Sequence, residues 1–157
     1  MSSIPVPGGA PPISLKTAEA TGSLGAALGA RLRVGDVVAL FGDLGAGKTT
    51  LTRGVLRGLG FAGEVASPTF PIVQTYEDIL VPVWHVDLYR IEHPAEIDEL
   101  ALEDARDHAA LVIEWPERLG GALWRDALEL HLAVAAGGVR SLTARVPPAW
   151  GERWPPS

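Results

Sequence analysis

One short stretch of the sequence has the residue types and the spacing of a loop that holds phosphate groups. Residues 42–49, GDLGAGKT, match the pattern G-x-x-x-x-G-K-[ST] at every fixed position. Glycines allow such a loop to bend closely around an anion, and successive backbone N–H groups point inward at the positive end of the following helix. Lys48 would place a positive charge beside the β- and γ-phosphates, and the Thr49 hydroxyl can ligate Mg²⁺. The stretch therefore predicts binding of a nucleoside triphosphate.

The amino-acid composition limits which base the bound nucleotide can carry, because the chain contains no asparagine. Proteins with this loop that bind GTP usually contact guanine through the motif N-K-x-D, which needs an asparagine. ATP is therefore favoured, although other ways of contacting guanine exist.

Two acids follow apolar runs that predict strands. Asp87 comes directly after residues 81–86, and Glu114 comes directly after residues 111–113. A hydrolase with a phosphate loop needs a carboxylate that holds Mg²⁺ and a group that orients water. If both strands run parallel to the strand before the loop, both carboxylates lie near the phosphates. Either acid alone could be an ordinary polar residue at a strand end, but two beside one phosphate loop favour a catalytic pair.

Other residues permit both a functional and an ordinary structural interpretation. His85 could move a proton, but a histidine on a strand is more often a half-buried packing residue, and we favour packing. Arg90 could clamp charge or form a surface ion pair. The hydroxyls of Ser67 and Thr69 could reach Mg²⁺ or the γ-phosphate, although this segment alone resembles an ordinary Ser-Pro turn. The seven acids of residues 92–107 predict either a solvated helix face or an acidic docking surface.

The elements that must position these residues follow from the hydrophobic pattern. Solid apolar runs predict strands buried on both faces, and apolar residues at helical spacing predict helices between them. A glycine pair between the last two apolar runs predicts a hairpin. The fold class is therefore α/β and P-loop NTPase-like, with a mainly parallel sheet flanked by helices and a C-terminal antiparallel hairpin. We expect strands at 13–16, 37–41, 70–76, 80–86, 109–115, 128–134 and 139–146, helices at 18–32 and 48–59, and one or two helices over about 94–107.

The composition excludes several classes of protein. The 157 residues are 47% hydrophobic and 20% charged, which is typical of a folded chain rather than a disordered one. The absence of cysteine excludes a disulfide scaffold, a thiolate zinc site and a cysteine nucleophile. A net charge of −6 argues against a strongly basic nucleic-acid-binding surface.

Length and patterning also bound the organisation of the chain. We expect a single domain over residues 1–157, with flexible tails at 1–12 and 147–157, because both ends are rich in proline. No uncharged stretch is long enough to span a membrane, and the start lacks the basic segment of a secretory signal. We therefore expect a cytoplasmic protein with no membrane contact.

Four motifs, taken in their order and spacing, resemble the TsaE family: GDLGAGKTT, SPTF, HVDLYR and IEWPE. The resemblance covers about residues 16–146. It implies a P-loop domain that binds ATP and Mg²⁺ and works with the TsaD and TsaB proteins. These proteins form threonylcarbamoyladenosine beside the anticodon of tRNA. The tRNA would be contacted indirectly, through the partners, which would agree with the acidic charge of this chain.

The resemblance also implies roles for individual residues. Glu114 corresponds to the acid associated with Mg²⁺, together with Thr49. Asp87 corresponds to a water-orienting or catalytic acid, and Arg140 resembles an arginine near the nucleotide. The implied catalytic residues are Asp87, Lys48 and Glu114; the ATP-binding residues are Leu44, Gly45, Ala46, Gly47, Lys48, Thr49, Thr50 and Arg140; and the switch residues are Ser67, Thr69, His85, Tyr89, Arg90 and Trp115.

Two other functions stay open from the sequence. A stand-alone P-loop kinase of a small molecule would usually carry an arginine-rich lid, and no such segment is visible. A nucleotide-dependent interaction switch, in which hydrolysis is incidental, is the other alternative. If the TsaE interpretation is right, we expect slow hydrolysis by the chain alone and faster hydrolysis with partners, because no arginine can be assigned to the γ-phosphate.

Overall fold

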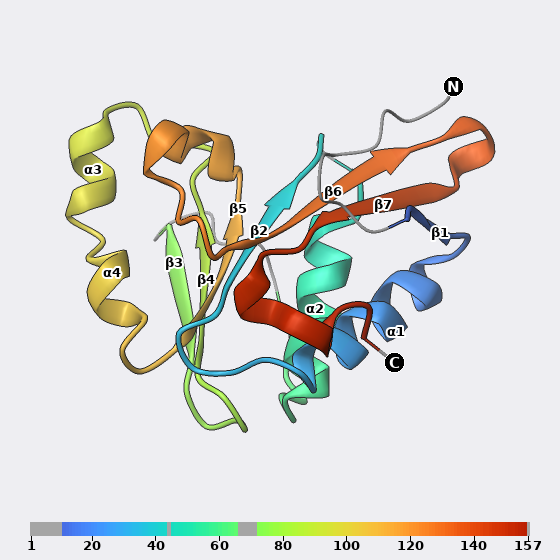
Figure 1. The fold of residues 1–157 in the computed structure, drawn as a ribbon, viewed down its shortest axis with the longest axis horizontal. Coiled ribbons are helices and arrows are strands. Elements are labelled where there is room, and N and C mark those ends of the chain that lie inside the picture. Colours follow the sequence, from blue (N-terminus) through green and yellow to red (C-terminus); the bar gives the residue numbers. More distant parts are fainter. Residues whose placement is uncertain (1–10, 44, 66–71, 157) are drawn as a thin grey trace.

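The apolar runs of the sequence form the strands of one sheet in the computed structural model, which describes residues 11–43, 45–65 and 72–156 (Figure 1). Seven strands lie in the order β1-β7-β6-β2-β5-β4-β3. Their bounds are β1 Ile13–Leu15, β2 Val37–Phe41, β3 Val73–Tyr76, β4 Val83–Asp87, β5 Ala110–Glu114, β6 Leu128–Val134 and β7 Arg140–Arg145.

The sheet is parallel at its centre and antiparallel at its edges. Strand β2 pairs in parallel with β5 and β6, and β5 pairs in parallel with β4. The hairpin of β6 and β7, the strand β1 beside it and the strand β3 at the other edge are antiparallel. The α/β fold class with its C-terminal hairpin is therefore confirmed. The parallel part comprises four strands, and the antiparallel pairing extends beyond the hairpin.

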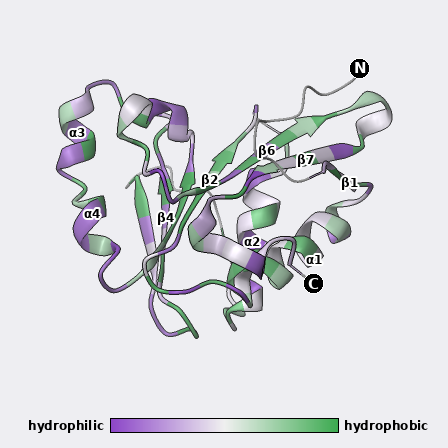
Figure 2. Ribbon diagram, viewed as in Figure 1, coloured by the Kyte–Doolittle hydropathy of each residue, from purple (hydrophilic) through white to green (hydrophobic). Residues whose placement is uncertain are grey.

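Helices cover both faces of the sheet and enclose two apolar clusters. Helices α1 (Ala18–Gly29) and α2 (Lys48–Gly58) pack on one face. The short helices α3 (Pro94–Asp98) and α4 (Leu102–Ala105), with the 3₁₀ segment η1 (Pro116–Ala122), cover the other face. The central strands between them are largely hydrophobic, as the green ribbon of β2 and β6 shows (Figure 2). Among the described residues, no helix is long and apolar enough to cross a membrane.

Close contact of the two backbones fixes α2 against α1. Each helix carries a pair of glycines four residues apart, Gly25 and Gly29 on α1 and Gly54 and Gly58 on α2. A Cβ atom on any of the four would come within 2.2–2.4 Å of a backbone oxygen of the other helix. Because only a hydrogen atom fits at these positions, the two axes approach closely. This packing anchors the helix whose first turn carries Lys48.

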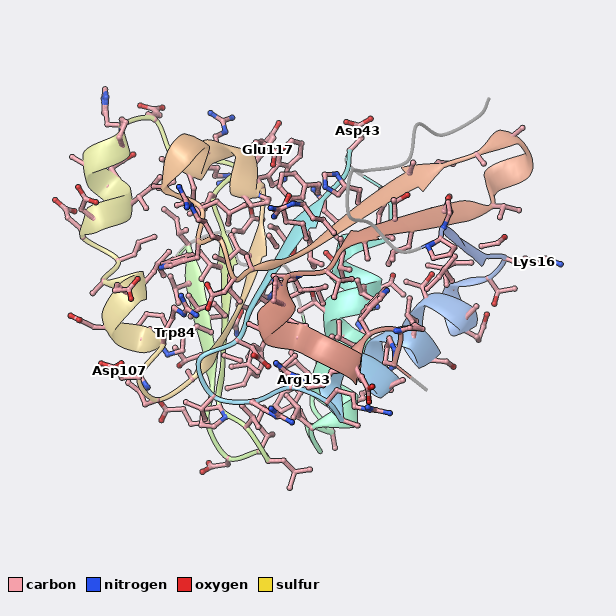
Figure 3. All side chains as sticks on the ribbon, in the orientation of Figure 1. Lys16, Asp43, Trp84, Asp107, Glu117 and Arg153 are labelled. Carbon is pink, nitrogen blue, oxygen red and sulfur yellow. The ribbon has the colours of Figure 1, made fainter. Side chains whose placement is uncertain are left out.

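The prediction of a flexible C-terminal tail is wrong for the residues that follow β7. The 3₁₀ segment η3 (Pro148–Arg153) packs against the connection between α1 and β2, where Figure 3 labels Arg153. The side chain of Trp150 is buried, and the Arg153 guanidinium donates two hydrogen bonds to the Asp36 carboxylate, at 2.7 and 3.1 Å. Proline predicted a loop here, but the area buried by tryptophan holds the segment in place. The N-terminal lead lies mostly outside the described residues.

Candidate functional site

The turn from β2 into α2 is an anion cradle built from backbone. Strand β2 leads directly into the loop of residues 42–49, and α2 begins at Lys48. Gly45 and Gly47 have φ angles of +82° and +106°, in the left-handed region that favours glycine. Gly47 is the residue that caps the start of α2. Backbone N–H groups at the start of this helix therefore face the pocket described next.

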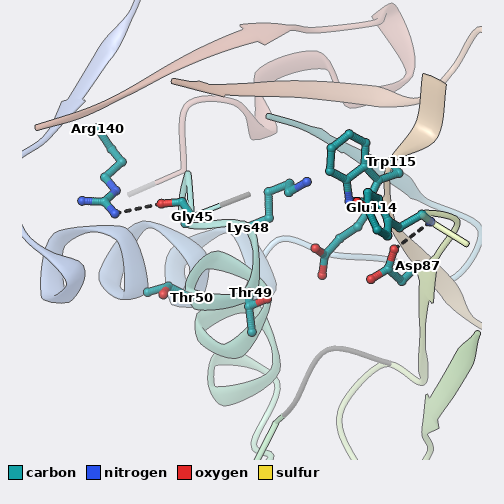
Figure 4. A pocket seen from close by; sticks show the side chains of 10 residues that line it. Gly45, Lys48, Thr49, Thr50, Asp87, Glu114, Trp115 and Arg140 are labelled. Carbon is teal, nitrogen blue, oxygen red and sulfur yellow. Dashed lines mark hydrogen bonds between the residues drawn. The ribbon is translucent and has the colours of Figure 1, made fainter. Parts of the chain in front are cut away.

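A pocket of about 300 Å³ lies over this turn (Figure 4). It brings together the loop, the carboxyl ends of β4 and β5, and the start of β7, which lie far apart in the sequence. Ten residues line it: Gly45, Gly47, Lys48, Thr49, Thr50, Asp87, Tyr89, Glu114, Trp115 and Arg140.

Most residues singled out in the sequence lie in or beside this pocket, with five exceptions. Leu44, Ser67 and Thr69 fall outside the described residues. Arg90 is exposed and is not among the described residues that line the pocket. Ala46 is buried beneath the loop instead of facing the pocket.

The two acids stand side by side. Strands β4 and β5 pair in parallel, and their register places Asp87 directly opposite Glu114. Both side chains point to the face of the sheet that α2 covers, because alternate residues of a strand share a face. Asp87 accepts a hydrogen bond of 3.0 Å from the backbone N–H of Tyr89, which lowers its pKa. Burial outweighs this bond and raises the pKa of the Asp87 carboxyl above its ordinary value.

Lys48 is a buried cation that lines the pocket. Its Nζ atom has no hydrogen-bond partner within the part of the chain that the structure describes. It lies 3.9 Å from the centre of the Trp115 ring, in a cation–π contact. Burial lowers the pKa of the Lys48 ammonium, and the negative charges of Glu114, Glu117 and Asp87 oppose this effect. Burying a cation without a hydrogen-bond partner costs free energy, and a bound anion would offset this cost, so the site favours an anion.

Trp115 forms one wall of the pocket in a strained backbone conformation. Its φ angle is +58°, which is uncommon for a large side chain, and Pro116 follows it at the start of η1. The Tyr89 ring packs on the Trp115 ring, with 4.9 Å between their centres. Tyr89 is itself 44% exposed, so this part of the wall is open to solvent.

His85 is not the simple packing residue that we favoured from the sequence. Its ring is fully buried, and its Nε2 atom lies 2.6 Å from Oε2 of Glu114. The spacing of His85 and Asp87 could have indicated this, because residues two apart on a strand share a face. What the sequence lacked was the pairing register of β4 with β5.

Arg140 connects the hairpin to the phosphate loop. Its Nη2 atom donates a hydrogen bond of 2.8 Å to the carbonyl oxygen of Gly45, and its Nη1 atom donates one of 3.0 Å to the carbonyl oxygen of Gly138. These two residues lie 95 and 2 positions away in the sequence. Arg140 therefore holds the loop in position and also lines the pocket.

The oxygen atoms around the pocket fit a hard divalent cation. Thr49, Asp87 and Glu114 supply a hydroxyl and two carboxylates. In the described ranges, no three histidine, cysteine, aspartate or glutamate side chains are grouped to hold a metal ion by themselves. Mg²⁺ commonly takes one or two carboxylates and completes its shell with nucleotide phosphates and water. The donor set here fits that arrangement.

The fold and the cradle define a P-loop nucleotide-binding protein of the α/β class. Residues 15–142 match the family model described as "Threonylcarbamoyl adenosine biosynthesis protein TsaE". The chain therefore belongs to the TsaE family, which takes part in the biosynthesis of threonylcarbamoyladenosine in tRNA.

Individual relatives agree with this assignment. The TsaE protein of Streptomyces coelicolor is 41% identical over 138 residues, which cover 83% of this chain and 91% of the relative. The TsaE protein of Bacillus subtilis is 38% identical over 110 residues, 69% of this chain and 68% of the relative. The crystal structure of Bacillus subtilis YdiB superimposes with a TM-score of 0.74 at 28% identity, covering 89% of this chain and 88% of that one.

Proposed function

We propose that this protein is a Mg²⁺-dependent ATPase that drives a step in the threonylcarbamoylation of tRNA adenosine, together with TsaD and TsaB. The observation that carries the proposal is the buried ammonium of Lys48, which has no hydrogen-bond partner among the described residues, beside two paired strand-end acids. Phosphoryl transfer requires a cation that binds phosphate and carboxylates that hold Mg²⁺. Membership of the TsaE family indicates the pathway in which this ATPase would act, the biosynthesis of threonylcarbamoyladenosine.

In this proposal each side of the pocket has a separate task. The backbone N–H groups at the start of α2 and the Lys48 ammonium bind the phosphates of ATP. Thr49 and Glu114 hold Mg²⁺, which neutralises charge on the β- and γ-phosphates when it is bound. Arg140 keeps the Gly45 carbonyl in place and so maintains the shape of the loop.

Asp87 orients the attacking water and accepts its proton. The water oxygen forms a bond to the γ-phosphorus, the bond between that phosphorus and the bridging oxygen breaks, and ADP leaves as phosphate is released. A carboxyl group whose pKa burial has raised accepts a proton more readily than an ordinary aspartate. Its bond from the Tyr89 N–H fixes one of its oxygens and leaves the other for water.

Slow hydrolysis in the absence of partners is part of the proposal. Of the arginines that the structure describes, Arg140 lines the pocket, and its guanidinium is already bonded to two carbonyl oxygens. An arginine that reaches the γ-phosphate would then come from a partner, and such a group raises rates by about 10³–10⁵-fold. The exposed ring of Tyr89 at the pocket wall offers a partner a direct contact.

The pathway is tested by reconstituting tRNA modification with TsaD and TsaB. We expect repeated rounds of threonylcarbamoyladenosine formation with the parent chain and ATP. Lys48→Met, which keeps the length of the side chain and removes the charge, should not sustain them. Equal product with and without this chain would refute the proposed function.

A further inference from the structure

The strongest feature that the proposed function leaves unused is the contact between His85 and Glu114. The ring of His85 is fully buried and Glu114 is 3% exposed, so water does not compete for their bond. His85 faces Val112 in the register, and Glu114 faces Asp87. The imidazole therefore reaches diagonally across the two strands to a carboxylate at the floor of the pocket, with 2.6 Å between Nε2 and Oε2.

The direction of this hydrogen bond follows from the other ring nitrogen. Nδ1 of His85 is buried and has no hydrogen-bond partner among the residues that the structure describes. A proton on Nδ1 would be a buried, unpaired N–H group, which is rarer and costlier than an unpaired acceptor. The single proton of a neutral ring therefore belongs on Nε2, which donates to the Glu114 carboxylate.

Donation to one oxygen leaves the other oxygen of Glu114 for the pocket. Figure 4 shows the Glu114 carboxylate directed into the pocket beside Thr49 and Asp87. A carboxylate with one oxygen fixed by a buried donor cannot rotate freely about its last side-chain bond. We propose that His85 is a positioning residue that holds Glu114 in the orientation in which its free oxygen can bind Mg²⁺. This inference rests on the proposed function, which assigns Mg²⁺ to Glu114.

The inference predicts an effect on metal affinity that is separate from folding. Loss of a hydrogen-bond partner behind a metal-binding side chain typically costs about 10–100-fold in metal affinity. Binding of the nucleotide without metal depends on the loop and Lys48 rather than on the orientation of Glu114, and should be unchanged.

The test compares three variants by titrating Mn²⁺ in the presence of a non-hydrolysable ATP analogue, followed by electron paramagnetic resonance. His85→Leu removes the donor at similar volume, and His85→Gln supplies an amide donor. Val83→Ala is the matched control, because Val83 is buried on the same face of β4 two residues earlier. Nucleotide affinity in EDTA and thermal stability are measured for all.

We expect His85→Leu to weaken Mn²⁺ binding about 10–100-fold, and His85→Gln to recover most of it. Val83→Ala should lose stability but bind Mn²⁺ like the parent. If the parent binds Mn²⁺ tightly and His85→Leu matches it, the positioning role is refuted while the proposed function stands. A parent without any metal-dependent affinity would refute both.

A second measurement does not depend on the variants folding. Nitrogen NMR of the metal-free parent protein, labelled at histidine, distinguishes a protonated Nε2 from a protonated Nδ1. We expect a His85 ring that is protonated at Nε2 and protected from solvent exchange. A ring that is protonated at Nδ1 and lacks a proton on Nε2 would overturn the inference.

Discussion

Asp87 and Glu114 are direct partners across the parallel pair β4 and β5, and both end their strands beside the first turn of α2. This relationship places two carboxylates next to a buried cation that lacks a hydrogen-bond partner in the described part of the chain. Because the carboxyl ends of these parallel strands lie side by side, neither acid needs a long loop to reach the pocket. The rigid sheet therefore sets the geometry of the site.

Removing the charge of Lys48 should separate nucleotide binding from folding. We expect Lys48→Met to lower ATP affinity by about 10–100-fold, since a charge-assisted contact contributes about 1.5–3 kcal/mol. The nucleotide-free variant should be as stable as the parent or more so, because a buried, unpaired ammonium is gone. Calorimetric titration with ATP and a thermal melt check both statements. Unchanged ATP affinity would mean that the loop is not the nucleotide site.

The two acids should matter more for hydrolysis than for binding. We expect Asp87→Asn to lower kcat by about 10²–10⁴-fold, the range for loss of a general base, and to leave ATP affinity within a few-fold of the parent. Glu117→Gln is the matched control, because Glu117 is an exposed acid that acts on Lys48 through charge alone. If Asp87→Asn hydrolyses ATP at the parental rate, Asp87 neither orients the attacking water nor accepts its proton.

The raised pKa of Asp87 also predicts how stability depends on pH. A carboxyl group whose pKa is raised by folding holds its proton more tightly in the folded state, so ionisation costs stability as pH rises through the folded pKa. Asp87→Asn cannot ionise and can still accept the Tyr89 N–H bond. We expect the variant to be more stable than the parent at neutral pH, with the difference vanishing as pH falls toward 3.8. Denaturant titrations of the metal-free proteins over this pH range would show it, and a constant difference would refute the assignment.

The contact of α1 with α2 should tolerate a methyl group at one glycine and not at another. At Gly54 a Cβ atom would lie 2.3 Å from the Gly22 carbonyl oxygen, so we expect Gly54→Ala to destabilise the fold by about 1–3 kcal/mol. At Gly22 a Cβ atom meets nothing within 4 Å, and Gly22→Ala in the same helix pair should be neutral or stabilising by up to about 1 kcal/mol. Similar midpoints of unfolding for the two variants would contradict this packing.

The parts of the structure that local pattern determines could be predicted from the sequence. The phosphate loop and the strands around it are encoded in contiguous residues, and β2 and β6 occupy the expected ranges. Some boundaries differ: the strand expected at 70–76 is present over Val73–Tyr76, with residues 70 and 71 outside the described residues, and the helix expected to reach residue 32 ends at Gly29.

Features that depend on register or on distant burial could not be predicted. The bond from His85 to Glu114 joins residues 29 positions apart and depends on how β4 pairs with β5. The ion pair of Asp36 with Arg153 joins residues 117 positions apart, and it converts an expected tail into packed structure. Glycine disfavours a helix locally, but the glycines of α1 are what permits its contact with α2.

The most direct test of the central claim is the rate of ATP turnover by this chain alone and in complex with TsaD and TsaB, at saturating ATP and Mg²⁺. We expect slow turnover alone and a large increase with both partners, because the arginine that lines the pocket is already engaged with Gly45 and Gly138. Lys48→Met should abolish the increase. Fast turnover alone that the partners leave unchanged would contradict partner-gated hydrolysis and favour a self-sufficient ATPase or a small-molecule kinase.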